Sequence, residues 1–128
     1  MKTIRIGIVG SRRRAKFSDY IKLLEALTYI ITKHKGHEWI FVSGGCPTGG
    51  DKFARDISIE LKIPIVEYLP KIKPKCSKQE FTVAAFARNT LIAQDCDVLI
   101  ALVAEDRKGG VEDTLRKAQK LNKPVVLL

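Results

Sequence analysis

The 128-residue sequence has a formal net charge of +9, with 45% hydrophobic and 29% charged residues. This composition is typical of one globular domain, expected to span 1–128, and no apolar run approaches the roughly 20 residues that cross a bilayer. We therefore expect no membrane partner. The N-terminal residues are typical of a strand rather than a signal peptide, and the three cysteines are widely spaced and odd in number. A cytoplasmic protein without a disulfide framework is the expectation.

Apolar strand segments alternate along the chain with segments of helical spacing. Ser77 to Glu80 has the form of a capping box, which opens the third helix, and a break near Ala87 is left open. In chain order, we expect strand 3–9, helix 17–35, strand 39–42, a helix from Asp51 that ends before Pro64, strand 63–69, a helix from Ser77 to about Asp95, strand 97–103, helix 111–121 and strand 123–128.

This alternation predicts right-handed βαβ units and one parallel sheet covered on both faces. The fold class is therefore α/β: a Rossmann-like domain with five mostly parallel strands. Ligands in such sheets bind beyond the carboxyl ends of the strands, where the strand order reverses. With an order of 3-2-1-4-5, that crevice lies between the first and fourth strands.

The positive charge is concentrated in three loops expected at this edge, although other lysines lie at the opposite edge. Such a field attracts phosphates and polyanions, which favours an anionic ligand. By loop, the basic residues are Arg12, Arg13, Arg14 and Lys16, then Lys71, Lys73, Lys75 and Lys78, and finally Arg107 and Lys108.

The stretch 43–58 follows the second strand and contains two glycine pairs, Gly44-Gly45 and Gly49-Gly50. Because glycine alone takes positive φ freely, we expect a tight turn or the close approach of a phosphorylated ligand. The spacing resembles a Walker A loop, but Asp51-Lys52 replaces its Lys-Ser/Thr pair, so a magnesium-binding phosphate loop is not indicated. Asp51 is expected to cap the helix, a role that is compatible with accepting hydrogen bonds from a ribose hydroxyl.

Two further loops also combine glycines with groups that could bind a phosphate. Gly10-Ser11-Arg12 ends the first strand, where Ser11 offers a hydroxyl and an amide and Arg12 a planar fork suited to phosphate. Gly109-Gly110 precedes the fourth helix. Arg88-Asn89 has two possible placements. In a continuous helix, Arg88 is expected to be solvated; if a helix starts near Arg88, the pair is expected to face the crevice.

The sequence contains no recognisable metal-ligand cluster, cofactor motif or nucleophile–base grouping, so we expect no metal and no resident cofactor. His34 and His37 are expected at the end of the first helix, away from the crevice.

Four segments together resemble the SLOG superfamily, and most closely its small YspA-like members: GIVGSRR, SGGCPTGGDKFA, ARNTLIAQDCDVLIAL and KGGVEDTLRKAQKLNKPV. The resemblance covers most of the chain and implies a Rossmann-like protein that binds a nucleotide or a nucleotide-derived ligand. It implies a site made of Gly10, Ser11, Arg12, Gly44, Gly45, Gly50, Asp51, Arg88, Asn89, Gly109, Gly110, Asp113 and Thr114.

Other members of the same superfamily suggest two alternative functions. LOG enzymes hydrolyse the N-glycosidic bond of nucleoside 5′-monophosphates, and here the candidate catalytic residues are Arg88, Glu112 and Asp113. The sequence departs from their PGGxGTxxE pattern, since no proline precedes Gly109. DprA-like relatives bind single-stranded DNA, which suits the charge, although few aromatic residues are expected to be free for stacking. A homo-oligomer is also left open.

Overall fold

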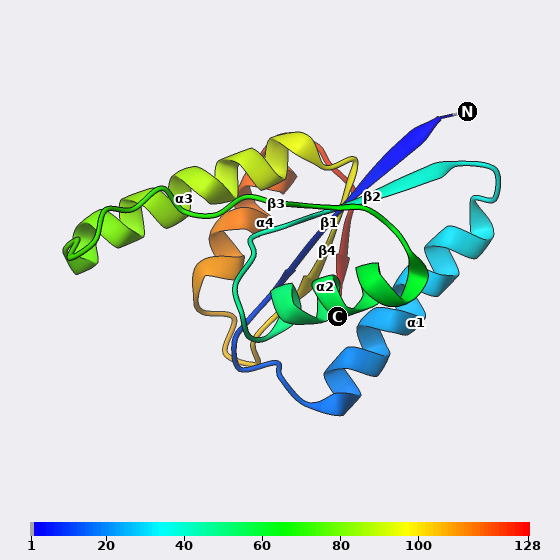
Figure 1. The fold of residues 1–128 in the computed structure, drawn as a ribbon, viewed down its shortest axis with the longest axis horizontal. Helices are drawn as coiled ribbons and strands as arrows, with labels where there is room; N and C mark the ends of the chain where they lie inside the picture. The colour runs from blue at the N-terminus through cyan, green and yellow to red at the C-terminus, as the bar shows by residue number, and fades with distance from the viewer. Residues whose placement is uncertain (1) are drawn as a thin grey trace.

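A computed structural model describes residues 2–128 as alternating strands and helices (Figure 1). The strands are β1 (Thr3–Gly10), β2 (Glu38–Ser43), β3 (Ile65–Glu67), β4 (Val98–Leu102) and β5 (Val125–Leu127). The helices are α1 (Phe17–Lys33), α2 (Gly50–Leu61), α3 (Lys78–Asp95) and α4 (Gly110–Lys120). No described helix is both long and apolar enough to cross a membrane.

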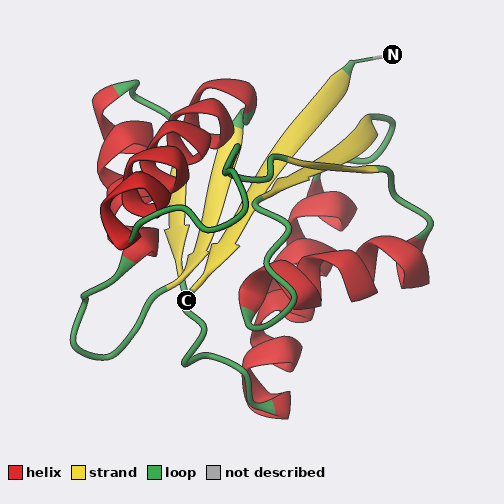
Figure 2. Ribbon diagram, turned by 60° about the vertical axis from the view of Figure 1, so that its left-hand side comes forward, coloured by secondary structure: helices red, strands yellow, loops and turns green. Residues whose placement is uncertain are grey.

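The sheet has the order β3-β2-β1-β4-β5, and every neighbouring pair is parallel. The expected α/β fold class and strand order are therefore confirmed. In Figure 2, α1 and α2 cover one face of the sheet and α3 and α4 cover the other. β1 lies at the centre, where the chain changes direction across the sheet, and this places the expected crevice at its carboxyl end.

Alternation along the strands divides the core into two layers, because successive side chains point to opposite faces. Ile6 and Ile8 of β1 face α1 and α2, whereas Val9 faces α3 and α4. The first layer is completed by Leu23, Leu27, Phe41, Phe53, Ala54, Ile57, Ile100 and Leu102, and the second by Val42, Ile92, Ala93, Cys96, Leu99, Ala101, Leu115 and Ala118.

Three elements differ clearly from the sequence prediction. β5, at Val125–Leu127, is shorter than the expected strand 123–128. β3 is shorter than the expected strand 63–69, because its only neighbour, β2, ends at Ser43 and offers no partner beyond Tyr68. α3 is continuous, without a break near Ala87. Its capping box is confirmed: the Glu80 amide donates to Ser77 Oγ at 3.1 Å, and the Ser77 amide donates to Glu80 Oε1 at 3.3 Å.

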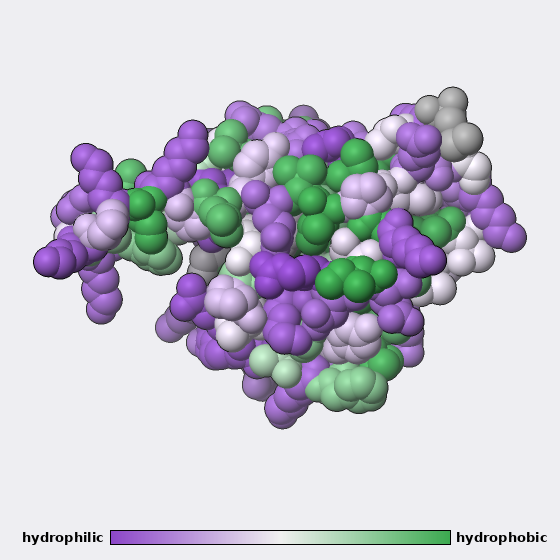
Figure 3. All heavy atoms as spheres, in the orientation of Figure 1, coloured by the Kyte–Doolittle hydropathy of each residue, from purple (hydrophilic) through white to green (hydrophobic). Residues whose placement is uncertain are grey.

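The first half of α3 and the segment before it project beyond the sheet as an arm, defined here as residues 69–87 (Figure 1). Apolar and polar atoms are interleaved on its surface (Figure 3). A groove of about 830 Å³ runs between α3 and the segment of chain that precedes it. The exposed large apolar residues of the arm are Leu69, Ile72, Phe81, Val83 and Phe86. Leu69, Ile72 and Val83 line the groove.

Candidate functional site

A cavity of about 420 Å³ lies at the carboxyl ends of β1, β2 and β4, a volume within the range of small-molecule sites. Of the residues expected at the site, ten line it: Gly10, Ser11, Arg12, Gly44, Asp51, Arg88, Asn89, Gly109, Gly110 and Thr114. Gly45, Gly50 and Asp113 lie outside it. The structure therefore brings together most of the expected residues between β1 and β4.

The glycines of the loop after β2 are required by the protein's own packing. A Cβ placed on Gly44 would lie 2.5 Å from Arg88 Nη1 and 2.9 Å from Asp51 Oδ2. A Cβ on Gly45 would lie 2.5 Å from a methyl of Leu69. Contacts within the protein therefore explain both glycines, and the φ of 73° at Gly45 agrees with the tight-turn alternative.

Gly49 and Gly50 form the contact between α2 and the end of β1. Gly49 has φ 70°, and a Cβ there would lie 2.8 Å from the carbonyl oxygen of Ser11. A Cβ on Gly50 would lie 2.6 Å from the Cα of Gly10, and a Cβ on Gly10 would lie 2.7 Å from the Cα of Gly50. The start of α2 therefore fits directly against the first loop, so the two loops support one another.

The glycines before α4 have different surroundings. Gly109 has φ 118°, a conformation that favours glycine. Gly110 does not have a positive φ, and among the described residues no atom beyond its chain neighbours and its own helix backbone lies within 4 Å of the Cβ that it lacks. Nothing in residues 2–128 therefore explains a glycine at position 110, on the wall of the cavity.

The three consecutive arginines are not equivalent. The Arg13 guanidinium pairs with both carboxylate oxygens of Asp106, at 2.7 and 2.9 Å. Arg14 is half-buried, and it binds Asp19 at 2.7 Å and the carbonyls of Val103 and Leu128. Arg12 is exposed on the cavity wall, and its side chain has no acidic or hydrogen-bonding partner within residues 2–128.

The amide of Ser11 is already engaged. It donates to the carbonyl oxygen of Leu102 at 2.9 Å, which joins the end of β1 to β4. The expectation that this amide holds a phosphate is therefore wrong. The hydroxyl oxygen of Ser11 accepts a hydrogen bond from the Arg13 amide at 3.2 Å, which leaves the hydroxyl proton free to donate.

Arg88 faces the cavity from within a continuous helix, so neither sequence alternative is correct as stated. Its Nη1 donates to the carbonyl oxygens of Gly44, at 2.7 Å, and Tyr68, at 3.2 Å. Burial lowers the pKa of Arg88, the Arg12 charge adds to this effect and Asp51 opposes it. The guanidinium stays protonated in a protein, so two cations lie close together at this wall.

Asp51 is the second residue of α2 and does not cap it; Gly49 holds the cap position. The buried carboxylate instead accepts a hydrogen bond from the Cys46 amide at 3.1 Å, which closes the glycine loop. Burial raises the pKa of Asp51, while the Cys46 amide and the Arg88 charge act against this shift. Asp51 is the only carboxylate among the described residues that line the cavity.

The two carboxylates expected to act in catalysis lie outside the cavity. Glu112 pairs with Arg107, with both contacts at 3.0 Å. Asp113 accepts hydrogen bonds from Lys117 at 2.9 Å and from Asn89 at 3.2 Å. Each carboxylate is thus held in an ion pair, and Asp113 orients Asn89 rather than facing a ligand.

The basic loops contribute less to the cavity than expected. Arg12, Arg13, Arg88 and Lys108 line it, whereas the arm lysines at 71, 73, 75 and 78 do not, which corrects their expected position. One further wall of the cavity, formed by Phe81, Thr82, Ala85 and Phe86 of α3, was not expected from the sequence. The spacing of residues 82, 85, 86 and 89 on one helical face is the signal that could have found it.

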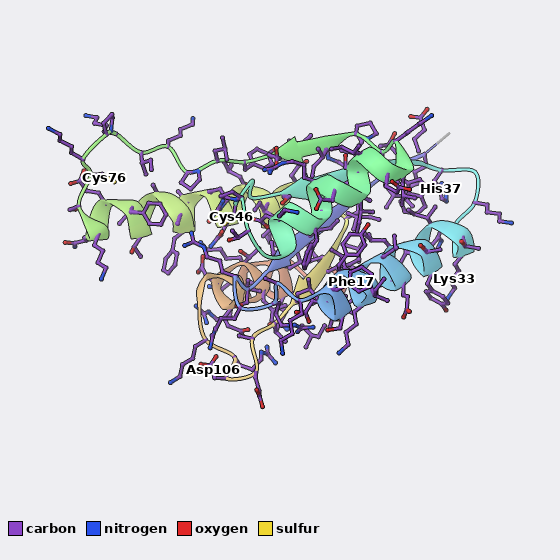
Figure 4. The ribbon with its side chains drawn as sticks, turned by 60° about the horizontal axis from the view of Figure 1, so that its bottom comes forward. Phe17, Lys33, His37, Cys46, Cys76 and Asp106 are labelled. Carbon is purple, nitrogen blue, oxygen red and sulfur yellow. The ribbon has the colours of Figure 1, made fainter. Side chains whose placement is uncertain are left out.

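Within residues 2–128, no group of three or more His, Cys, Asp or Glu side chains is placed to hold a metal ion. Figure 4 shows Cys46 beside the start of α2 and Cys76 at the far end of the arm. Cys96 is buried, and all three thiols are free. The functional groups that line the cavity are guanidinium, ammonium, carboxylate, thiol, hydroxyl, amide and aromatic groups.

This architecture defines a Rossmann-like α/β protein with a basic cavity at the carboxyl edge of its sheet. No family model and no curated protein matches the sequence. Among solved structures, the molybdenum cofactor carrier protein MCP from Chlamydomonas reinhardtii is similar, with TM-score 0.69 and 23% identity over 98% of this chain and 76% of that chain. The structural-genomics target TM1055 is also similar, with TM-score 0.60 and 20% identity over 98% of this chain and 72% of that chain. These similarities show the fold.

Proposed function

We propose that this protein is a SLOG-type module that binds a nucleotide or a nucleotide-derived phosphorylated ligand in the cavity. The observation that carries the proposal is Arg12, a guanidinium on the cavity wall whose charge no acidic side chain balances within the described residues. A phosphate is the natural partner for such a planar fork. The ligand's phosphate would bind Arg12, the Ser11 hydroxyl and the first amides of α4.

The electrostatics of the wall support an anion at this place. Arg12 and Arg88 lie close enough for the charge of one to lower the pKa of the other, and an anion between them would relieve that repulsion. At the start of α4, Gly110 and Val111 line the cavity, and at a helix N-terminus the free amides and the helix dipole favour negative charge. A fold neighbour named as a cofactor carrier is compatible with small-molecule binding.

Hydrolysis of the ligand receives no comparable support. An oxocarbenium-like transition state requires a carboxylate beside the sugar, and both Glu112 and Asp113 are held in ion pairs outside the cavity. The carboxylate that does line the cavity, Asp51, is buried and accepts a hydrogen bond from the Cys46 amide. We therefore propose binding without turnover.

Isothermal titration at low salt with AMP, ADP-ribose, NAD, cyclic AMP and inorganic phosphate tests the proposal. We expect at least one phosphorylated compound to bind more tightly than inorganic phosphate, and to bind more weakly when Arg12 is replaced by alanine. If the folded protein binds none of the compounds, the proposal is wrong.

A further inference from the structure

Two phenylalanines of α3, Phe81 and Phe86, line the cavity while remaining exposed. Their exposed fractions are 38% and 42%. Neither ring stacks on another aromatic side chain among the described residues, unlike Phe53, which packs edge-to-face on Tyr20. Exposed rings of this size leave apolar area uncovered, and here the uncovered area faces a binding cavity.

Lys117 of α4 holds Phe86 from one side. Its ammonium nitrogen lies 5.5 Å from the ring centroid and donates to the carbonyl oxygen of Phe86 at 2.7 Å. The same nitrogen donates to Asp113 at 2.9 Å, which in turn holds Asn89. Phe86 thus lines the cavity while a cation lies over its ring.

The cavity lining consequently has two chemically different parts, called here its two ends because they come from different elements. Arg12, Lys108 and the start of α4 supply positive charge and amides. The α3 wall supplies two aromatic rings, together with Arg88 and Asn89. A molecule that matches both parts carries an anionic group and a flat apolar group.

We propose that Phe86, with Phe81 beside it, is an aromatic subsite that stacks on the heterocyclic base of the ligand. The inference rests on the proposed function for the phosphate end, and it assigns the specificity for a base to the projecting half of α3. A ligand with phosphate and sugar but no base would leave the two rings uncovered.

Titration of the wild-type protein with AMP, ribose 5-phosphate and adenosine separates the two ends. We expect AMP to bind at least fivefold more tightly than ribose 5-phosphate. Phe86→Ala should weaken AMP binding by roughly 5- to 150-fold, the range for the loss of one base–aromatic stack, and leave ribose 5-phosphate unchanged. Phe86→Leu should recover only part of the loss, since it restores apolar volume without a flat ring.

Phe17→Ala is the matched control. Phe17 is also an exposed phenylalanine, 76% exposed, but it is the first residue of α1 and does not line the cavity (Figure 4). All three affinities should be unchanged in this variant. Circular dichroism checks folding, and if Phe86→Ala does not fold, Phe81→Ala and Phe86→Leu carry the test with the same expected selective loss of AMP affinity.

Each outcome decides between the two proposals. Equal affinity for AMP and ribose 5-phosphate, or equal loss of both in Phe86→Ala, would overturn the aromatic subsite and leave phosphate binding intact. Adenosine binding as tight as AMP binding, and lost in Phe86→Ala, would support the subsite and overturn the phosphate proposal. If the folded protein binds none of the three probes, the aromatic subsite is wrong, and the titrations with ADP-ribose, NAD and cyclic AMP decide the proposed function.

Discussion

At the scale of single residues, Arg12 differs from its two neighbours in what it contacts. Arg13 is satisfied by Asp106, and Arg14 joins α1 to the C-terminal residue. A charge-assisted hydrogen bond contributes about 1.5–3 kcal/mol. Arg12→Ala should therefore weaken binding of the nucleotide found by titration about ten- to a hundredfold with little change in stability, and Arg12→Lys should recover part of the loss because it keeps the charge but not the fork.

The neighbouring arginines supply the controls for this prediction. Arg13→Ala should change affinity far less, since its guanidinium is already paired. Arg14→Ala should lower the melting temperature, because it leaves Asp19 and two carbonyl groups without their donor. Equal small losses of affinity at all three positions would mean a diffuse basic surface without a specific phosphate contact.

Asp95 belongs to a structural network with a predictable pH dependence. Its carboxylate accepts two hydrogen bonds from Arg5, at 2.7 and 2.8 Å, and one from the Tyr68 hydroxyl at 2.8 Å. The Arg5 contacts first, and then Tyr68, hold the pKa of Asp95 below its ordinary value against the effect of burial. The folded state thus binds fewer protons than the unfolded state at acid pH, and stability rises with pH in that window.

Asp95→Asn should consequently lower the free energy of unfolding at pH 7 by about 1–3 kcal/mol. The contribution of Asp95 is fully present above the ordinary aspartate pKa of about 3.9 and is lost as the pH falls through the lowered folded value. Urea denaturation of both proteins from pH 7 down to pH 3 should show the difference shrinking below pH 4. If the difference in unfolding free energy between the two proteins does not change with pH, the loss of stability comes from packing rather than from the Asp95 charge.

At the scale of elements, the first turn of α4 carries a glycine without a structural reason. Gly110→Ala introduces a methyl group into open space, and it should raise stability by about 0.4–1 kcal/mol because the unfolded chain loses freedom. The same methyl group stands on the cavity wall, where it should weaken nucleotide binding. Denaturation and titration of one variant measure the two effects.

Gly44→Ala is the matched comparison for this turn, because its Cβ would displace Arg88 and Asp51. It should lose stability as well as affinity. If Gly110→Ala binds nucleotide as tightly as the wild-type protein, the ligand does not approach the start of α4.

Elements were predictable where the pattern of apolar residues alone decides the outcome. The five strands, the four helices and the capping box at Ser77 follow from spacing and from one local motif. The side-chain contacts were not predictable in this way. Arg88 faces the cavity although its helix is continuous, and it donates a hydrogen bond to the carbonyl oxygen of Gly44. These two residues are far apart in the sequence, and only the folded sheet brings them together. Gly44 and Gly50 have protein neighbours from distant segments, and no local pattern shows them.

At the scale of the whole molecule, much of the positive charge lies away from the cavity. The arm lysines are exposed, and those at positions 71 and 73 line the outer groove. Affinity for AMP should therefore fall only weakly with salt, with a log–log slope of magnitude below about 2, since one phosphate group neutralises one or two charges. Single-stranded DNA, if bound, should give a slope of about 0.7 per phosphate neutralised.

A Lys71→Glu/Lys73→Glu variant separates these two modes of binding. It should leave AMP titrations unchanged and abolish any affinity for oligonucleotides. A parallel loss of both would place the nucleotide on the arm rather than in the cavity.

The contact between Gly10 and Gly50 also determines when the site forms during folding. These residues are far apart in the sequence, and their backbones meet only after β1 has entered the sheet and α2 has docked. An intermediate without a docked α2 would have no assembled site, so a ligand stabilises the finished molecule alone. In stopped-flow experiments, the bound nucleotide should then slow unfolding and leave the refolding rate unchanged.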